Sequence, residues 1–114
     1  MTYFADYLDV DFGPAEIHVE KYTSNGNICL RALSKDTGEP LRQFTKNFDK
    51  LGLYQIAINI SEGAADTYVG ILQSANIIED HPEGGAPLGY GDTRSSYPVF
   101  NLTQSFRSWM TAQG

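Results

Sequence analysis

Apolar and polar residues alternate along the first half of the chain. Between residues 15 and 22, Ile17 and Val19 alternate with charged or polar neighbours, the period of two that is typical of a half-buried β-strand. The dipeptide Asn25-Gly26 comes next, a strong hairpin signal because both residues tolerate a positive φ. The apolar run at 28–33 is then the returning strand. This pattern predicts an antiparallel β-hairpin.

Two more strands are predicted before residue 61. A turn at 35–38 ends in glycine and separates the hairpin from a third strand at 41–48. The alternation at 41–48 is weak, which favours a position at the edge of a sheet. A fourth strand at 54–60 places four apolar residues on one face. The segment 2–10 fits either an additional strand or a short helix, because its apolar residues also recur at helical spacing.

After residue 61 the apolar spacing changes to three and four. The stripe over 64–75 predicts an amphipathic helix, with Ser61 as its N-cap and Asn76 ending it in a left-handed conformation. Gly70 lies inside this stripe, and we expect another segment of the chain to pass close to it. A last short strand is predicted at 97–102.

The C-terminal third contains a loop and an extension. Glycine and proline concentrate in the loop 81–96, too densely for regular structure, so we expect either a binding element or a flexible connection. In the extension 103–114, Phe106, Trp109 and Met110 recur at helical spacing, which predicts a short helix or an ordered tail. Trp109 either docks on the core or is presented to a partner.

These elements predict one α+β domain covering residues 1–114. Its antiparallel β-sheet has four to six strands, with one main α-helix packed on one face. A length of 114 residues suits a single domain, and 41% apolar with 19% charged residues is ordinary for a soluble globular protein. No run of 18 apolar residues is present and no basic segment opens the chain, so we expect neither a membrane span nor a signal peptide.

Charge is distributed unevenly around the net value of −6. Residues 1–20 carry five acids and no Lys or Arg, residues 21–50 carry six bases and three acids, and residues 59–93 carry six acids and no base. If the two acidic segments meet in the fold, they form a negative face that repels nucleic acid and attracts basic surfaces. The alternative is ordinary charge that keeps the protein soluble.

Catalytic chemistry has little support in the sequence. Cys29 is the single cysteine, which excludes an internal disulfide. His18 and Cys29 fall on adjacent predicted strands, so a nucleophile pair is conceivable, but no third orienting group is evident. We expect His18 to be solvated and Cys29 to be inert.

Metal, phosphate and nucleic-acid sites are also poorly supported. The cluster Glu79-Asp80-His81 could ligate a divalent cation, but it lacks a second histidine or cysteine. The strand-to-helix segment 58–63 lacks the lysine and the glycine spacing of a phosphate loop. An isoelectric point near 4.6 disfavours direct nucleic-acid binding. We therefore expect no catalytic residue, no metal, no cofactor and no membrane contact.

Several short motifs occur in a characteristic order between residues 17 and 102. They are Val19-Glu20-Lys21-Tyr22 with Asn25-Gly26-Asn27, Thr37-Gly38-Glu39-Pro40 with Thr45-Lys46-Asn47, Leu72-Gln73-Ser74-Ala75-Asn76-Ile77-Ile78, and Gly89-Tyr90 with Tyr97-Pro98-Val99. In this order the chain resembles a family of small uncharacterised proteins (a domain-of-unknown-function family) carried by conjugative elements and phages. It departs from that family at Ser61-Glu62-Gly63 and after Leu102.

The resemblance implies an accessory protein of a mobile element, acting in the cytoplasm of a bacterial host cell. Small acidic proteins in that setting look like inhibitors of host defence, such as anti-CRISPR or anti-restriction proteins. This analogy is based on the size of the protein and on the kind of genetic element that carries the family. The function we predict is a non-enzymatic accessory protein that binds and inhibits a host protein through an acidic surface. The partner would present a basic surface, as a nucleic-acid-binding defence protein does.

The residues expected to contact such a partner are acidic or aromatic. They are Glu62, Asp66, Glu79, Asp80 and Glu83 for charge, and Tyr90, Tyr97 and Trp109 as anchors. Two alternatives stay open: a small-molecule or nucleotide sponge that uses the Gly/Pro loop, and an enzyme that uses Cys29 or a carboxylate pair. A homodimer through the strand edge at 41–48 is compatible with all three.

Overall fold

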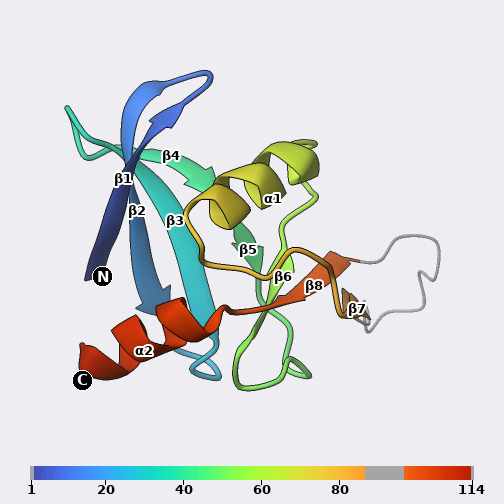
Figure 1. The fold of residues 1–114 in the computed structure, drawn as a ribbon. Helices are drawn as coiled ribbons and strands as arrows, with labels where there is room; N and C mark the ends of the chain where they lie inside the picture. Colours follow the sequence, from blue (N-terminus) through green and yellow to red (C-terminus); the bar gives the residue numbers. More distant parts are fainter. Residues whose placement is uncertain (1, 87–96, 114) are drawn as a thin grey trace.

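The computed structural model describes residues 2–86 and 97–113, which form two antiparallel sheets and two helices (Figure 1). In chain order the elements are β1 (Thr2–Asp9), β2 (Gly13–Lys21), β3 (Ile28–Ser34), β4 (Pro40–Gln43), β5 (Thr45–Lys46), β6 (Gln55–Ile58), α1 (Ala65–Ser74), β7 (Gly84–Ala86), β8 (Tyr97–Asn101) and α2 (Gln104–Ala112). The strand orders are β1-β2-β3-β4 and β5-β6-β8-β7. The predicted α+β class is confirmed, but the prediction of a single sheet is wrong.

The two sheets meet where the predicted strand 41–48 bends at Phe44. The Phe44 side chain is fully buried, and its backbone bonds to both sheets. Its N–H donates to the Leu30 carbonyl of β3 at 3.0 Å, and its carbonyl accepts from the Asn59 N–H after β6 at 2.8 Å. One predicted strand therefore becomes β4 at the edge of one sheet and β5 at the edge of the other.

In the first sheet, the hairpin turn lies where the sequence predicted it. Lys21 pairs with Ile28 across the predicted hairpin, and Gly26 has the positive φ that the turn requires. The segment 2–10 is a strand, β1, rather than a helix. A bulge between Tyr3 and Ala5 lets both Phe4 and Tyr7 pack against the core, which explains why the apolar residues of this strand mimic helical spacing.

Helix α1 nearly matches the predicted stripe over 64–75, but its N-cap differs, and the expectation that another segment passes close to Gly70 is wrong, because a Cβ there would meet no atom within 4 Å. Tyr68 and Leu72 are its buried residues, and Asn76 follows it with a φ of 57°, as predicted. Its N-cap is Ala64, without a side-chain hydrogen bond, because the Ser61 hydroxyl instead bonds to the Asn59 side chain at 2.5 Å. The prediction of Ser61 as the cap is therefore wrong.

The two helices pack on different parts of the molecule. On α1, the Tyr68 ring lies edge-on to Phe44, 5.2 Å away, at the bend between the sheets, so this helix does not simply cover one face of one sheet. On α2, Phe106 is buried, and Trp109 lies edge-on to Phe4 of β1 at 4.9 Å. The extension 103–114 is thus mainly a helix docked on the core, and Trp109 docks with it. Neither helix described is long and apolar enough to cross a membrane.

The core lies between the two sheets and the two helices. Its fully buried apolar residues come from both sheets, the bend between them, α1 and the segment after α1: Ile17, Leu30, Ala32, Phe44, Ile56, Ile58, Leu72 and Ile77. The Gly/Pro-rich loop does contain regular structure, because Gly84–Ala86 pairs with Tyr97–Val99 as β7 and β8. The expectation of no regular structure is wrong for these three residues. Tyr90 and the rest of 87–96 lie outside the described residues.

Candidate functional site

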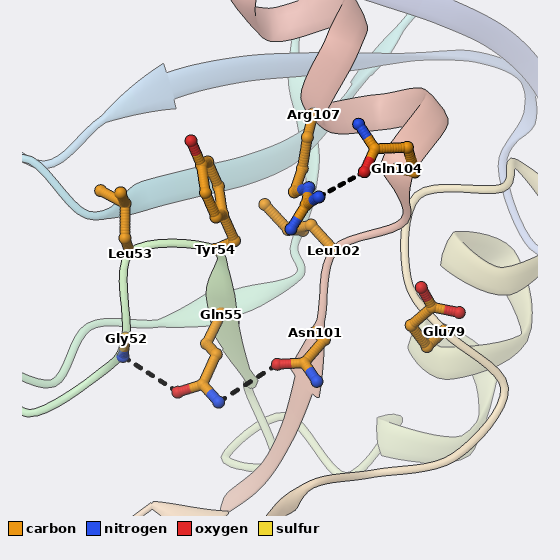
Figure 2. Close-up of a pocket in the computed structure, with 9 residues that line it drawn as sticks. All are labelled: Gly52, Leu53, Tyr54, Gln55, Glu79, Asn101, Leu102, Gln104 and Arg107. Carbon is orange, nitrogen blue, oxygen red and sulfur yellow. Dashed lines mark hydrogen bonds between the residues drawn. The ribbon is translucent and has the colours of Figure 1, made fainter.

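A cleft of about 450 Å³ opens between the start of β6, the end of β8 and the first turns of α2 (Figure 2). Residues from four segments of the chain form its walls: Gly52, Leu53, Tyr54, Gln55, Glu79, Asn101, Leu102, Gln104 and Arg107. Two adjoining hollows share Tyr54 and Arg107 with it and continue along α2 past Trp109. The result is one elongated depression beside α2.

Side-chain amides hold the floor of the cleft in place. Gln55 donates to the Asn101 side-chain carbonyl at 3.1 Å and accepts from the Gly52 N–H at 2.9 Å, as Figure 2 shows. A Cβ on Gly52 would lie 2.9 Å from the Gln55 amide oxygen, so a larger residue would disturb this bond. Asn101 in turn donates to the Glu83 carboxylate at 2.6 Å. This chain of bonds ties β6, β8 and the segment before β7 into one surface.

An aromatic residue, an aliphatic residue and a cation occupy the upper wall. The guanidinium carbon of Arg107 lies 4.6 Å from the centroid of the Tyr54 ring, and Arg107 also donates to the Gln104 side chain. Leu53 is 81% exposed and Tyr54 is 43% exposed. Large apolar side chains that are exposed to solvent beside a hollow are typical of protein interaction sites.

Three of the predicted acidic residues gather at one end of the cleft. Glu79 lines it, Glu83 bonds to its floor, and Asp80 lies between them. The Gln73 side chain of α1 donates to the backbone carbonyls of Glu79 and Asp80, which fixes this segment. All three acids are exposed, and none has an ion-pair partner within the described parts of the chain. We call Glu79, Asp80 and Glu83 the acidic rim.

The other two predicted acids lie elsewhere. Glu62 and Asp66 are exposed just before and within the first turn of α1, whereas Gln73 contacts the acidic rim from the end of this helix, roughly 10 Å further along its axis than Asp66. Glu62 accepts a hydrogen bond from the Tyr68 hydroxyl. Burial, followed by this bond, raises the pKa of Tyr68 to about 12. The structure therefore does not gather the five acids into one patch.

The predicted aromatic anchors are also separated. Trp109 lines the continuation of the cleft along α2. Tyr97 is half-buried and lies edge-on to Phe48 at 5.1 Å, in a second, smaller apolar cluster. Tyr90 falls outside the residues that the structure describes. Of the three aromatics, the structure places only Trp109 beside the cleft.

Leu53, Tyr54 and Arg107 were missed by the sequence reasoning. The pattern of the predicted strand 54–60 placed Tyr54 on the same face as three isoleucines, but β6 begins at Gln55 and Tyr54 precedes it. A signal was present in Leu51-Gly52-Leu53, an apolar pair around a glycine that fits no strand pattern. Arg107 carried no signal of its own.

The first acidic segment is largely neutralised inside the fold. The carboxylate of Asp6 lies 2.5 Å from the ammonium group of Lys35, and that of Glu20 lies 3.2 Å from the guanidinium group of Arg31. Arg42 pairs with both Asp9 and Asp11. The segments 1–20 and 21–50 thus pair with each other, so segment 1–20 adds little to a negative face.

The Arg42–Asp9 pair is deeply buried. Arg42 donates from Nε and Nη2 to the two Asp9 oxygens, at 2.7 and 2.8 Å, and the Tyr7 hydroxyl donates to Asp9 at 2.6 Å. These bonds, with Arg42 the largest cause, hold the pKa of Asp9 well below its usual range. Burial and the negative charge of Asp9 raise the pKa of Tyr7 above its ordinary value. This network supports the fold rather than forming a binding site.

Cys29 and His18 lie on paired strands, as expected, but their side chains bond to other residues. Cys29 is only 1% exposed, and its thiol lies 3.7 Å from a carboxylate oxygen of Glu20. His18 bonds to Glu16 at 3.0 Å and faces Arg31 on β3. Among residues 2–86 and 97–113, no three His, Cys, Asp or Glu side chains lie close enough together to hold a metal ion.

Comparison of the chain with family models, curated proteins and solved structures found no match.

Proposed function

We propose that this protein is a non-enzymatic binding protein, and that its cleft and acidic rim dock on a basic surface of a partner protein. The observation that carries the proposal is that the acidic rim borders the same cleft that exposed Leu53 and Tyr54 line, with Glu79 in its wall and Glu83 bonded to Asn101 of its floor. Protein interfaces combine a central apolar contact with a polar or charged rim, and this surface offers both.

Each part of the surface has a distinct role in this proposal. Leu53 and Tyr54 supply the apolar anchor, since aromatic and aliphatic side chains that become fully desolvated contribute most of the binding energy. The acidic rim selects a partner that carries Lys or Arg at the matching position, and it accelerates the encounter. The amide floor keeps the surface in one shape, so that little ordering is needed on binding.

The partner we propose is a bacterial host protein, such as a component of a CRISPR-Cas or restriction system. This part of the proposal is supported by the resemblance to accessory proteins of mobile elements. Proteins that bind nucleic acid present basic grooves, and an acidic rim fits such a groove. A bound protein of this size would inhibit by occupying the groove.

Charge reversal at the rim tests the proposal. The variant E79K/D80K changes two exposed side chains, and D36K/E39K makes the same change of charge on the exposed β3–β4 turn. Each tagged protein is used to capture partners from bacterial lysate, and affinity is then measured with the purified partner. We expect E79K/D80K to bind at least about tenfold more weakly, a loss of about 1.4 kcal/mol, and D36K/E39K to bind like the wild type.

Two results would contradict the proposal. One is equal affinity of the two variants for the captured partner, which would remove the acidic rim from the interface. The other is that the wild type retains no protein at all. Thermal unfolding of both variants shows whether either change disturbs the fold.

A further inference from the structure

The larger of the two hollows that adjoin the cleft has a volume of about 730 Å³. It lies between α2, the end of β2 and the start of β3 (Figure 1). Small-molecule sites have volumes of roughly 300–1,000 Å³ and are lined mostly by apolar and aromatic side chains. Residues of this kind come here from β2, β3, α2 and the segment before β6: Val19, Ile28, Leu53, Tyr54, Trp109 and Met110. We call this cavity the α2 hollow.

Two bases line the α2 hollow without a carboxylate partner among the described residues. Its charged lining residues are Glu20, Lys21 and Arg107. Glu20 pairs with Arg31 at 3.2 Å, which balances its charge. Lys21 follows buried Val19 by two residues and so points to the same face of β2, whereas Glu20 points to the opposite face. No ion pair joins Lys21 or Arg107 to another described residue. The hollow is therefore positively charged, in a chain of net charge −6.

Arg107 is held in place and keeps donors free. Its guanidinium carbon lies 4.6 Å from the centroid of the Tyr54 ring, a contact that positions the group without neutralising it. Among the described residues its side chain donates only to Gln104, the bond drawn in Figure 2. A guanidinium group has five N–H donors, so others remain for an incoming anion.

We propose that the α2 hollow binds a small aromatic carboxylate, with its ring on the apolar lining beside Trp109 and its carboxylate held by Lys21 and Arg107. The apolar lining would supply affinity, and charge-assisted hydrogen bonds from the two bases would select an anion. This site goes beyond the proposed function. It shares Tyr54 and Arg107 with the cleft, but it selects the opposite charge from the acidic rim.

Titration with 2-naphthoate, an aromatic carboxylate, tests the proposal. Trp109 is the only tryptophan of the chain and lines the hollow, so its single indole N–H signal in the NMR spectrum reports on this site. Neutral 2-naphthalenemethanol and cationic 2-naphthylmethylammonium carry the same ring and are the matched probes. We expect 2-naphthoate to shift the indole signal saturably, and to bind at least about tenfold more tightly than either matched probe.

Variants of the two bases test the role of their charge. K21M/R107M removes both charges and keeps apolar stems, K21R/R107K keeps both charges, and Lys50→Met removes an exposed charge outside the hollow. K21M/R107M should bind 2-naphthoate at least about tenfold more weakly and no longer prefer it to the neutral probe. The other two variants should bind it like the wild type. E79K/D80K, the test of the proposed function, should bind it no more weakly than the wild type, so the two proposals can fail separately.

Three results would overturn the proposal: no saturable shift of the indole signal, equal affinity for the three probes, or unchanged affinity of K21M/R107M for 2-naphthoate. Lys21 is exposed, so Lys21→Met alone repeats the test if the double variant does not fold, and it should also weaken binding. A short peptide that ends in phenylalanine with a free carboxylate is the last probe. If it bound more tightly than 2-naphthoate through the same two bases, the free ligand would be overturned in favour of the carboxyl end of a partner protein.

Discussion

At the scale of single residues, Arg42 shows where a sequence pattern stops. Arg42 has the same parity as Phe44, but the weak alternation of 41–48 indicated neither that Arg42 is buried nor which carboxylate it pairs with. Asp9 lies 33 residues earlier in the chain, and four other acids in the first 20 residues were equally eligible.

Replacing Arg42 by methionine should strongly destabilise the fold. The change keeps an unbranched apolar stem but removes the guanidinium group, which leaves Asp9 buried without its counter-charge and typically costs about 3–5 kcal/mol. Lys35→Met is the matched control, because its ion pair with Asp6 is exposed and is worth about 1 kcal/mol or less. Urea unfolding of both variants measures the difference. Equal losses of unfolding free energy would show that the buried pair is not a principal support of the fold.

At the scale of secondary structure elements, local signals located most strands and both helices. The two turns centred on Gly26 and Gly38 were predictable because a positive φ there favours glycine. The bend at Phe44 and the short strand β7 were not predictable in this way. Each depends on a partner strand distant in sequence, β6 for the bend and β8 for β7. Gly84–Ala86 has no strand propensity of its own and pairs because β8 offers a free edge.

The start of α2 offers a test at this scale. The Thr103 hydroxyl accepts from the Phe106 N–H at 3.1 Å and donates to the Asn76 carbonyl at 2.6 Å, so it both caps α2 and ties it to the end of α1. Thr103→Ala should lower the unfolding free energy by about 1–2 kcal/mol. Thr111→Ala, at an exposed position in the same helix, should change it little. Thermal or urea unfolding checks both, and a Thr103→Ala protein as stable as Thr111→Ala would contradict the role of the cap.

At the scale of the whole molecule, the fold sorts the charges into two sets. Four of the five acids of the first 20 residues pair with bases of 21–50, whereas the acidic rim has no ion-pair partner in the described part of the chain. Charge counting selected the three residues that form the acidic rim together with Glu62 and Asp66, which lie at the far end of α1, and their role in binding stays a prediction. Tyr54 and Arg107 escaped prediction because their contact joins β6 to α2, which no local pattern connects.

The measurement that tests the central claim most directly is hydrogen exchange of the chain alone and in complex with its captured partner. The account predicts slower exchange in the complex over residues 52–55 and 79–83, the segments that carry the anchor and the acidic rim. Unchanged exchange in both segments would contradict the proposed binding surface. Slower exchange confined to β1 and α1 would contradict it as well, because the partner would then bind outside the cleft.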